Sequence, residues 1–299
     1  MNRSTFYKLY EVMKKKSPVY ASLWIKSRNE FGAVWEQEVS DNISKVFGDM
    51  YNLKWEEAVN GYSSFCIDAH KATMYFEKHG KYKSSSYEEC FKNCYHSPEY
   101  MTLRYLPGQY LSHYIWPHHQ KMLQNYVKKI LPLIKLDILK FFEVGVGCGM
   151  YSQKTLENLP KARGVGYDIS DYSLEFTYRV VEAHGFSDRY NIRNQNILEN
   201  DIEDQADLIV CQEVLEHLED PQKFIKALYR AVRPEGWGYI TAAINAAHTD
   251  HIYLYRSENE VRTQIEAAGW KIIDVQIEEN YPEKPKELRP TIAGFLAKK

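Results

Sequence analysis

This 299-residue chain lacks long apolar runs, a signal peptide and a cysteine framework. No apolar stretch approaches the roughly 20 residues that a membrane helix needs, so we expect no membrane partner. Residues 1–8, MNRSTFYK, lack the apolar core of a secretion signal. The five cysteines are an odd number without paired spacing, which favours free thiols in a reducing compartment. We therefore expect a cytoplasmic protein.

The chain also lacks a strong charge of either sign. It holds 38 basic and 40 acidic residues, a net charge of −2. Residues 1–140 hold 20 Lys and Arg against 14 Asp and Glu, whereas residues 141–299 hold 18 against 26. This mild asymmetry fits two regions of different origin, or an ordinary bias of the solvated surface. We expect no nucleic-acid partner.

From about Ile138 the chain alternates between strand and helix patterns. This alternation predicts a mostly parallel sheet with right-handed crossovers. The turn between the last two strands leaves no room for a crossover helix, so the seventh strand should run antiparallel to the sixth. The expected strands are 138–144, 164–168, 190–193, 207–211, 237–242, 271–277 and 291–297, with helices at Tyr172–Ala183, Pro221–Val232 and Glu258–Ala268 and a turn at 233–236.

Residues 1–137 have helical periodicity instead, and no internal repeat is visible. We interpret them as an α-helical cap and substrate region over the mouth of a sheet domain that spans 138–299. The predicted cap helices are Thr5–Lys16, Val34–Val46, Trp55–Ala58, Ile67–Lys78, Tyr87–Cys94 and His113–Leu131.

A glycine-rich turn follows the first predicted strand. Residues 141–149 read FFEVGVGCG, so that Glu143 is followed by Gly145, Gly147 and Gly149. A strand that ends in such a turn and leads into a helix is typical of a nucleotide site. The spacing fits neither the dinucleotide loop G-x-G-x-x-G nor the phosphate loop G-x-x-x-x-G-K-[ST]. The turn has no basic residue, which favours a ligand with a neutral or cationic head.

The turn resembles motif I of the class I S-adenosylmethionine (SAM)-dependent methyltransferases, and four later blocks follow in the family's order. The resemblance implies a Rossmann-like, doubly wound, seven-stranded sheet of order 3-2-1-4-5-7-6. Asp168 lies 19 residues beyond Gly149 at a strand end, where a carboxylate can accept hydrogen bonds from both ribose hydroxyls. The family usually has Asp at the adenine contact, where this chain has Asn196. The cofactor residues implied are Glu143, Gly145, Gly147, Gly149, Asp168, Ile169, Asn196, Ile197, Gln212 and Glu213.

In this family the segment ahead of motif I shapes the acceptor pocket. An aromatic face holds a cation well, so we predict that Tyr110, Tyr114 and Trp116 help line that pocket. The alternative is that these aromatics only pack the cap onto the sheet. His113, His118 and His119 could supply a general base or a substrate contact. We take Tyr110, Tyr114, His118 and His119 as catalytic candidates and Trp116 and His113 as substrate-binding candidates.

Two further groups of polar residues lie after the fourth and fifth strands. The resemblance places substrate contacts in the loop after strand five, where Asn245, His248 and His251 are candidates. Glu213, Glu216 and His217 are spaced to share one face of a helical turn. Certain RNA and quinone-precursor O-methyltransferases hold a divalent cation with a similar group and a further His, here His248 or His251. Our main prediction is a site without metal, with this group as the alternative.

The predicted function is SAM-dependent methyl transfer to a small molecule, by in-line displacement in a pocket closed by the cap. An amino-acid-like, amine, carboxylate or hydroxyl acceptor would suit the polar groups. One alternative is a cyclase or lyase that releases methylthioadenosine on the same fold. Another is a SAM-binding subunit without catalytic activity that activates a partner.

Overall fold

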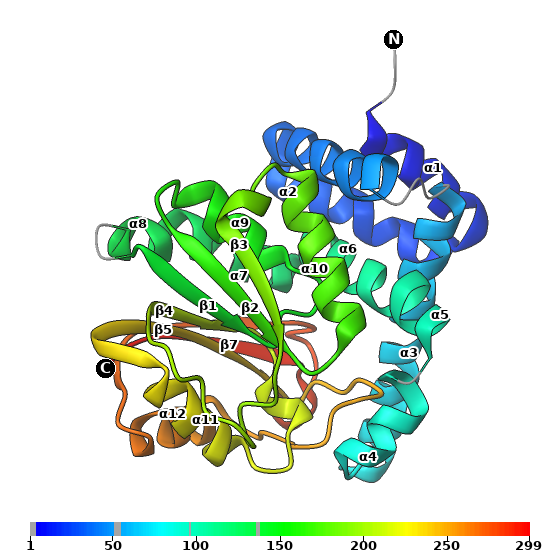
Figure 1. Ribbon diagram of the computed structural model, residues 1–299. Coiled ribbons are helices and arrows are strands. Elements are labelled where there is room, and N and C mark those ends of the chain that lie inside the picture. Colours follow the sequence, from blue (N-terminus) through cyan, green and yellow to red (C-terminus); the bar gives the residue numbers. More distant parts are fainter. Residues whose placement is uncertain (1–3, 51–54, 96, 136–137) are drawn as a thin grey trace.

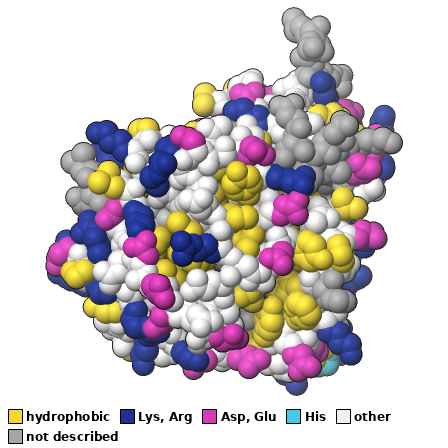
Figure 2. Space-filling model, viewed as in Figure 1, with side chains coloured by type: hydrophobic (Ala, Val, Ile, Leu, Met, Phe, Trp, Pro, Cys, Tyr) yellow, Lys and Arg dark blue, Asp and Glu magenta, His cyan; other side chains and the backbone are white. Residues whose placement is uncertain are grey.

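The computed structural model describes residues 4–50, 55–95, 97–135 and 138–299, and it joins a helical N-terminal half to a sheet flanked by helices (Figure 1). Across these residues, none of the helices combines the length and the apolar character needed to cross a membrane. Figure 2 shows that basic and acidic side chains are interspersed over the face in view.

The central sheet has seven strands in the order β3-β2-β1-β4-β5-β7-β6. β7 pairs antiparallel with β5 and β6, and the other neighbours are parallel. This confirms the predicted topology. The strand order reverses between β1 and β4, where open sheets of this kind bind ligands. The strands are β1 Lys140–Val144, β2 Arg163–Asp168, β3 Tyr190–Asn194, β4 Ala206–Cys211, β5 Val232–Ile244, β6 Lys271–Glu279 and β7 Thr291–Lys298.

Helices cover both faces of the sheet because adjacent strand residues point to opposite faces. Phe142 belongs to a core that includes α11 and α12, whereas Phe141 belongs to a second core that includes α9, α10 and the N-terminal helices. The helices after β1 are α9 Met150–Asn158, α10 Asp171–Ala183, α11 Pro221–Arg230 and α12 Glu258–Ala267, with single turns at Ser187–Arg189, Leu215–His217 and Lys286–Leu288.

The described residues of the N-terminal half are mostly helical, apart from the loop at 80–86 and short breaks between helices, and this half shares its core with one face of the sheet. Its division from the sheet domain at 137/138 stays a proposal, and that boundary touches residues 136–137, which lie outside the described residues. The helices are α1 Thr5–Lys16, α2 Pro18–Ile43, α3 Trp55–His79, α4 Tyr87–Cys90, α5 Pro98–Tyr100, α6 Leu106–Ile115, α7 Pro117–Asn125 and α8 Leu131–Ile134, with π-helical segments at Ser44–Met50, Phe91–Tyr95, Met101–Tyr105 and Tyr126–Ile130.

Several boundaries differ from those predicted. The two helices predicted between Trp55 and Lys78 are one helix, in which Gly61 permits close packing: a Cβ there would lie 2.4 Å from the Leu103 carbonyl oxygen. The helix predicted over His113–Leu131 begins earlier, at Leu106, and breaks at Trp116, because the residue before a proline favours extended backbone. The turn predicted at 233–236 lies within β5.

A buried polar junction joins the N-terminal half to the sheet domain. The Asn42 side-chain oxygen on α2 accepts a hydrogen bond from Gln153 Nε2 on α9 at 2.8 Å and lies 2.7 Å from His184 Nε2, just after α10. The Tyr110 hydroxyl on α6 donates to Gln153 Oε1 at 3.1 Å. Buried polar groups need such partners, so this junction fixes how the two halves meet.

Candidate active site

The glycine turn after β1 has a conformation that only glycine adopts readily. Gly145, Gly147 and Gly149 have φ of 79°, 50° and 72°, in the left-handed region. A Cβ on Gly149 would also lie 2.9 Å from the Thr177 Cα atom. Gly149 is the N-cap residue of α9, which begins at Met150. The E-x-G-x-G-x-G spacing therefore follows from the turn's geometry.

Two carboxyl groups flank this turn. Asp168, at the end of β2, accepts a hydrogen bond from Ser170 N at 2.9 Å and lies 3.4 Å from Gly147 N; burial raises its pKa to about 6. Glu143 is 2 % exposed and hydrogen-bonds Ser152 Oγ, and burial raises its pKa to about 8. In the ligand-free protein at neutral pH, Asp168 is therefore mostly ionised and Glu143 mostly protonated.

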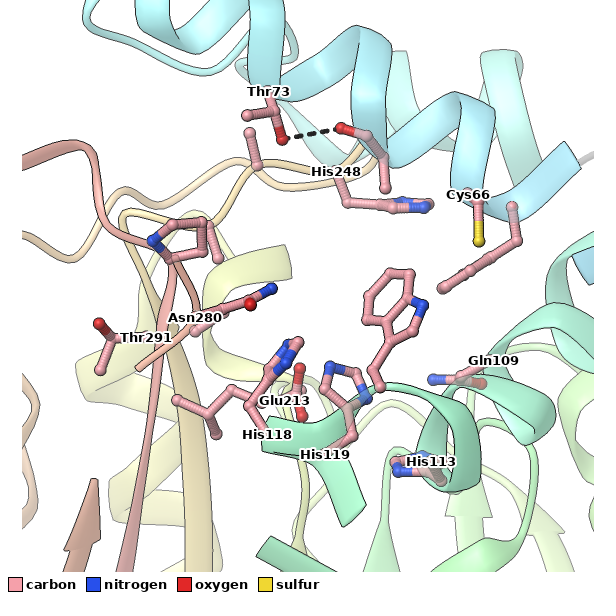
Figure 3. A pocket seen from close by; sticks show the side chains of 18 of the residues that line it. Cys66, Thr73, Gln109, His113, His118, His119, Glu213, His248, Asn280 and Thr291 are labelled. Atoms are coloured by element: carbon pink, nitrogen blue, oxygen red, sulfur yellow. Dashed lines mark hydrogen bonds between the residues drawn. The ribbon is translucent and has the colours of Figure 1, made fainter. Parts of the chain in front are cut away.

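A pocket of about 720 Å³ opens from this turn toward the N-terminal helices. Its walls come from α2, α3, α6 and α7, from the segments after β4 and β5, and from the β6–β7 loop. Figure 3 shows His113, His118 and His119 on one side of it and His248 near Cys66 and Thr73 of α3. The predicted residues that line it are His113, Trp116, His118, His119, Glu143, Gly145, Gly147, Gln212, Glu213, His248 and His251.

Tyr110 and Tyr114 lie outside this lining. Both are fully buried in the core between the N-terminal helices and the sheet domain, with their rings 5.8 Å apart. On α6 the pocket is lined instead by Gln109 and His113, which share the neighbouring face of the helix. The geometry therefore corrects the prediction that these two tyrosines line the pocket. Gln109 was missed, although its spacing of four from His113 could have identified it.

We expect Tyr114→Phe to keep full activity. Tyr114 is fully buried and is not among the residues that line the pocket, so the loss of its hydroxyl should remove no contact with a ligand. Steady-state kinetics and thermal denaturation should match those of the unmodified protein. A loss of kcat without a loss of stability would contradict this placement.

The three neighbouring histidines form one buried group. The His118 and His119 rings are 4.6 Å apart, and those of His113 and His119 are 5.4 Å apart. Burial lowers the pKa of His113 to about 4 and that of His118 to about 3, and it holds the pKa of His119 well below its usual range. The rings are neutral at pH 7 but poorly matched to take up a proton there. They suit hydrogen bonding to a ligand better than base catalysis.

Gly149, Asp168 and several other predicted residues are not among the residues that line the pocket. The Asn196 side-chain oxygen accepts a hydrogen bond from Leu198 N at 3.0 Å within its own turn, Ile197 is buried in the core, and Ile169 is 44 % exposed. Asn245 is buried, and its amide nitrogen donates to the Arg256 carbonyl at 3.3 Å, which stabilises the loop after β5. Their roles as ligand contacts stay predictions.

Glu216, His217 and His251 form the group best placed to hold a metal ion among the described residues. One ligand atom from each lies within 4.8 Å of the others. Both Glu216 carboxyl oxygens are buried and have no hydrogen-bond partner among the described residues. Burial, with repulsion from Glu213, raises the Glu216 pKa well above its usual value. His217 Nδ1 lies 3.0 Å from the Asp250 carbonyl, and His251 Nδ1 lies 2.7 Å from the Ala246 carbonyl.

These contacts leave Nε2 of both rings for a further ligand, an arrangement typical of metal-binding histidines. Glu216 and His217 belong to the alternative group predicted from the sequence, and His251 is one of the two further histidines suggested for it, whereas Glu213 is not part of the group. Glu213 lines the pocket nearby, with a positive φ of 50°. A mixed carboxylate and imidazole set suits Mg²⁺, Mn²⁺ or Zn²⁺.

Comparison with known families identifies the sheet region. Residues 142–237 match the family described as "Methyltransferase domain". By sequence this stretch is therefore similar to a methyltransferase domain, and it lies within the seven-stranded sheet region. This match confirms the resemblance drawn from the glycine turn and the blocks that follow it.

Part of the chain is also similar in sequence to curated bacterial enzymes. It is 28 % identical over 112 residues to a ubiquinone biosynthesis O-methyltransferase of Leptothrix cholodnii, a match that spans 36 % of this chain and 45 % of that protein. The corresponding enzyme of Idiomarina loihiensis is 32 % identical over 101 residues, which span 32 % of this chain and 39 % of that protein. The chain thus spans less than half the length of these relatives.

Solved structures share the fold over a longer stretch. An O-methyltransferase family protein from Burkholderia thailandensis has a TM-score of 0.53 at 12 % identity and covers 80 % of this chain and 71 % of its own. The pyocyanin biosynthetic protein PhzM has a TM-score of 0.53 at 14 % identity, covering 81 % and 72 %. At these identities the likeness supports the fold of the methyltransferase domain and extends into the N-terminal half.

Proposed function

We propose that the protein transfers a methyl group from SAM to a small molecule in the pocket between the glycine turn and the N-terminal helices. The observation that carries this proposal is a set of buried side-chain atoms beside the turn that have no hydrogen-bond partner among the described residues. These atoms are Gln109 Oε1, Gln212 Oε1 and Gln212 Nε2. Buried polar groups without partners are costly, and the ammonium and carboxylate of SAM would satisfy both donors and acceptors. Glu143 and Glu213 suit its positive charge.

The residues present therefore fit SAM, which would supply the methyl group as an electrophile. Asp168 would accept hydrogen bonds from the ribose, and the protein's main task would be to align donor and acceptor and to exclude water. Trp116, Phe65 and Tyr105 give the acceptor side aromatic walls. The relatives are O-methyltransferases, so we favour a hydroxyl acceptor over an amine or a carboxylate.

The test is incubation of the purified chain with methyl-deuterated SAM, first alone and then with a panel of phenols, catechols, amines and carboxylates. Mass spectrometry should find S-adenosylhomocysteine together with a deuteromethylated acceptor. Methylthioadenosine formed from SAM alone would overturn methyl transfer in favour of a cyclase or lyase. Tight SAM binding without turnover, with retention of a partner protein, would point to a subunit without catalytic activity.

SAM binding at pH 7 is expected to release close to one proton. Glu143, with a pKa of about 8 in the free protein, is mostly protonated there, and a nearby cation favours its ionised form. Calorimetry in buffers of different ionisation enthalpy measures this release. Glu143→Gln should remove the part of this release that comes from Glu143, and any remainder would come from Glu213, whose pKa is raised by burial to about 7. Equal proton release by that variant would show that Glu143 does not titrate on binding.

A second candidate is metal-assisted methyl transfer to a hydroxyl, and the unpaired Glu216 carboxyl group favours it. Glu216, His217 and His251 would hold a divalent ion, which would lower the pKa of an acceptor hydroxyl. Nothing in the SAM proposal depends on this ion. Addition of Mg²⁺, Mn²⁺ or Zn²⁺ to chelator-treated protein tests the site through a rise in Tm.

A further inference from the structure

Asp250 is a buried carboxylate that the sequence prediction did not single out. It is 0 % exposed and belongs to the loop after β5, where its side chain contacts the N-terminal half. Its Oδ2 accepts hydrogen bonds from the hydroxyls of Tyr95 at 2.8 Å and Tyr105 at 2.7 Å. Its Oδ1 lies 2.7 Å from His248 Nδ1. A buried carboxylate is tolerated only with such partners, so the arrangement is specific.

These contacts tie the loop after β5 to the N-terminal half at several points. Ser84 Oγ donates to the Thr249 carbonyl at 2.8 Å, and Cys90 Sγ lies 3.5 Å from the Asp250 carbonyl. Tyr95 and Tyr105 add the two bonds to the Asp250 side chain. The loop that carries His248 belongs to the sheet domain and is therefore held in place by the N-terminal half.

The position of Asp250 decides which nitrogen of His248 carries the hydrogen. A carboxylate oxygen can only accept, so Nδ1 of the ring must donate to it. In a neutral ring this leaves Nε2 without hydrogen and able to accept a bond. Nε2 is buried and has no hydrogen-bond partner within the part of the chain that the structure describes, and His248 lines the pocket. The His248 ring packs against the Phe65 ring, with their centroids 4.8 Å apart and their planes tilted by 34°.

We propose, building on the proposed methyl transfer, that His248 Nε2 accepts a hydrogen bond from an O–H or N–H group of the acceptor and so determines which acceptors are bound. Asp250, held by Tyr95 and Tyr105, is the positioning residue that fixes the required tautomer. An analogue without that O–H or N–H leaves Nε2 buried and unpaired, which should weaken its binding about 10- to 100-fold.

The tautomer can be read directly in the full-length protein. Long-range ¹H–¹⁵N spectra of histidine-labelled protein, assigned with His248→Gln, should show Nδ1 protonated and Nε2 bare. Asp250→Asn should reverse this pattern, because the amide can donate to Nδ1. Hydrogen on Nε2 in the unmodified protein would overturn the proposal. That spectrum decides the tautomer even if Asp250→Asn fails to fold.

The substrate role is tested with the best acceptor of the panel. His248→Gln should raise its KM about 10- to 100-fold and leave the Kd for SAM unchanged, whereas His79→Gln, at an exposed position of α3 that does not line the pocket, should change neither. An unchanged KM in His248→Gln overturns the substrate role. If the unmodified protein methylates no acceptor, the proposed function fails, and the spectrum still reports separately on the tautomer.

Discussion

Asp168→Ala is expected to weaken SAM binding roughly 10- to 150-fold, the equivalent of about 1.5–3 kcal/mol for hydrogen bonds to a charged group. Asp168 lies at the end of β2 beside Gly147, where its carboxylate can accept from both ribose hydroxyls. Calorimetric titration of SAM measures the change. Asp188→Ala, which removes an exposed carboxylate before β3, is the matched control and should bind SAM normally.

The pH dependence of SAM binding separates Asp168 from Glu143. The pKa of Glu143 is about 8, so affinity should rise with pH up to that value as binding displaces its proton. The pKa of Asp168 is about 6, so below pH 6 a second proton must leave and the affinity should fall more steeply. Asp168→Ala should lose only this steeper part. Unchanged SAM affinity in Asp168→Ala at pH 7 would contradict the ribose assignment.

If methyl transfer is metal-assisted, Glu216→Gln is expected to lower kcat by about 100-fold or more while the Kd for SAM stays unchanged. A metal ion contributes several kcal/mol to stabilising charge in a transition state, and Glu216 is the carboxylate of the candidate group. Its raised pKa means that the metal must displace a proton, so metal affinity should increase with pH. Activity after chelation and after return of Mg²⁺, Mn²⁺ or Zn²⁺ provides the measurement.

Stability distinguishes this role from a structural one. Glutamine has the size of the protonated carboxyl group it replaces, so the metal-free variant should keep its Tm, and the rise in Tm on metal addition should disappear. Glu182→Gln, on the exposed side of α10, serves as the control. Full activity of Glu216→Gln in the presence of chelator would remove metal assistance and leave methyl transfer as proposed.

The sheet domain was predictable because its signals are local. Strands such as β1, β4 and β7 are short, mainly apolar runs, and Gly145, Gly147 and Gly149 are required by the backbone of one turn. The antiparallel β7 follows from the short β6–β7 connection together with the family resemblance. The β5 boundary was less accessible, because residues 233–236 combine proline and glycine, which usually mark a turn, within a strand.

The pocket was harder to predict because it depends on helix rotation and on distant segments. One residue along a helix turns the side chain by about 100°, so the aromatic character of Tyr110 and Tyr114 could not decide whether they or Gln109 and His113 face the pocket. His251 joins Glu216 from a loop after the next strand. No short-range pattern sets that meeting, which depends on the packed sheet.

The junction at Asn42 makes the two halves of the molecule thermodynamically dependent on each other. Asn42 accepts a hydrogen bond from Gln153 of α9, and the N-cap residue of α9 is Gly149 of the glycine turn. Any ligand that orders the turn therefore also favours the docked position of α2. Linkage is reciprocal, so whatever strengthens the docking of α2 must tighten the ligand by the same factor. Affinity at the turn can thus be tuned from Asn42, a residue of α2 that does not itself line the pocket.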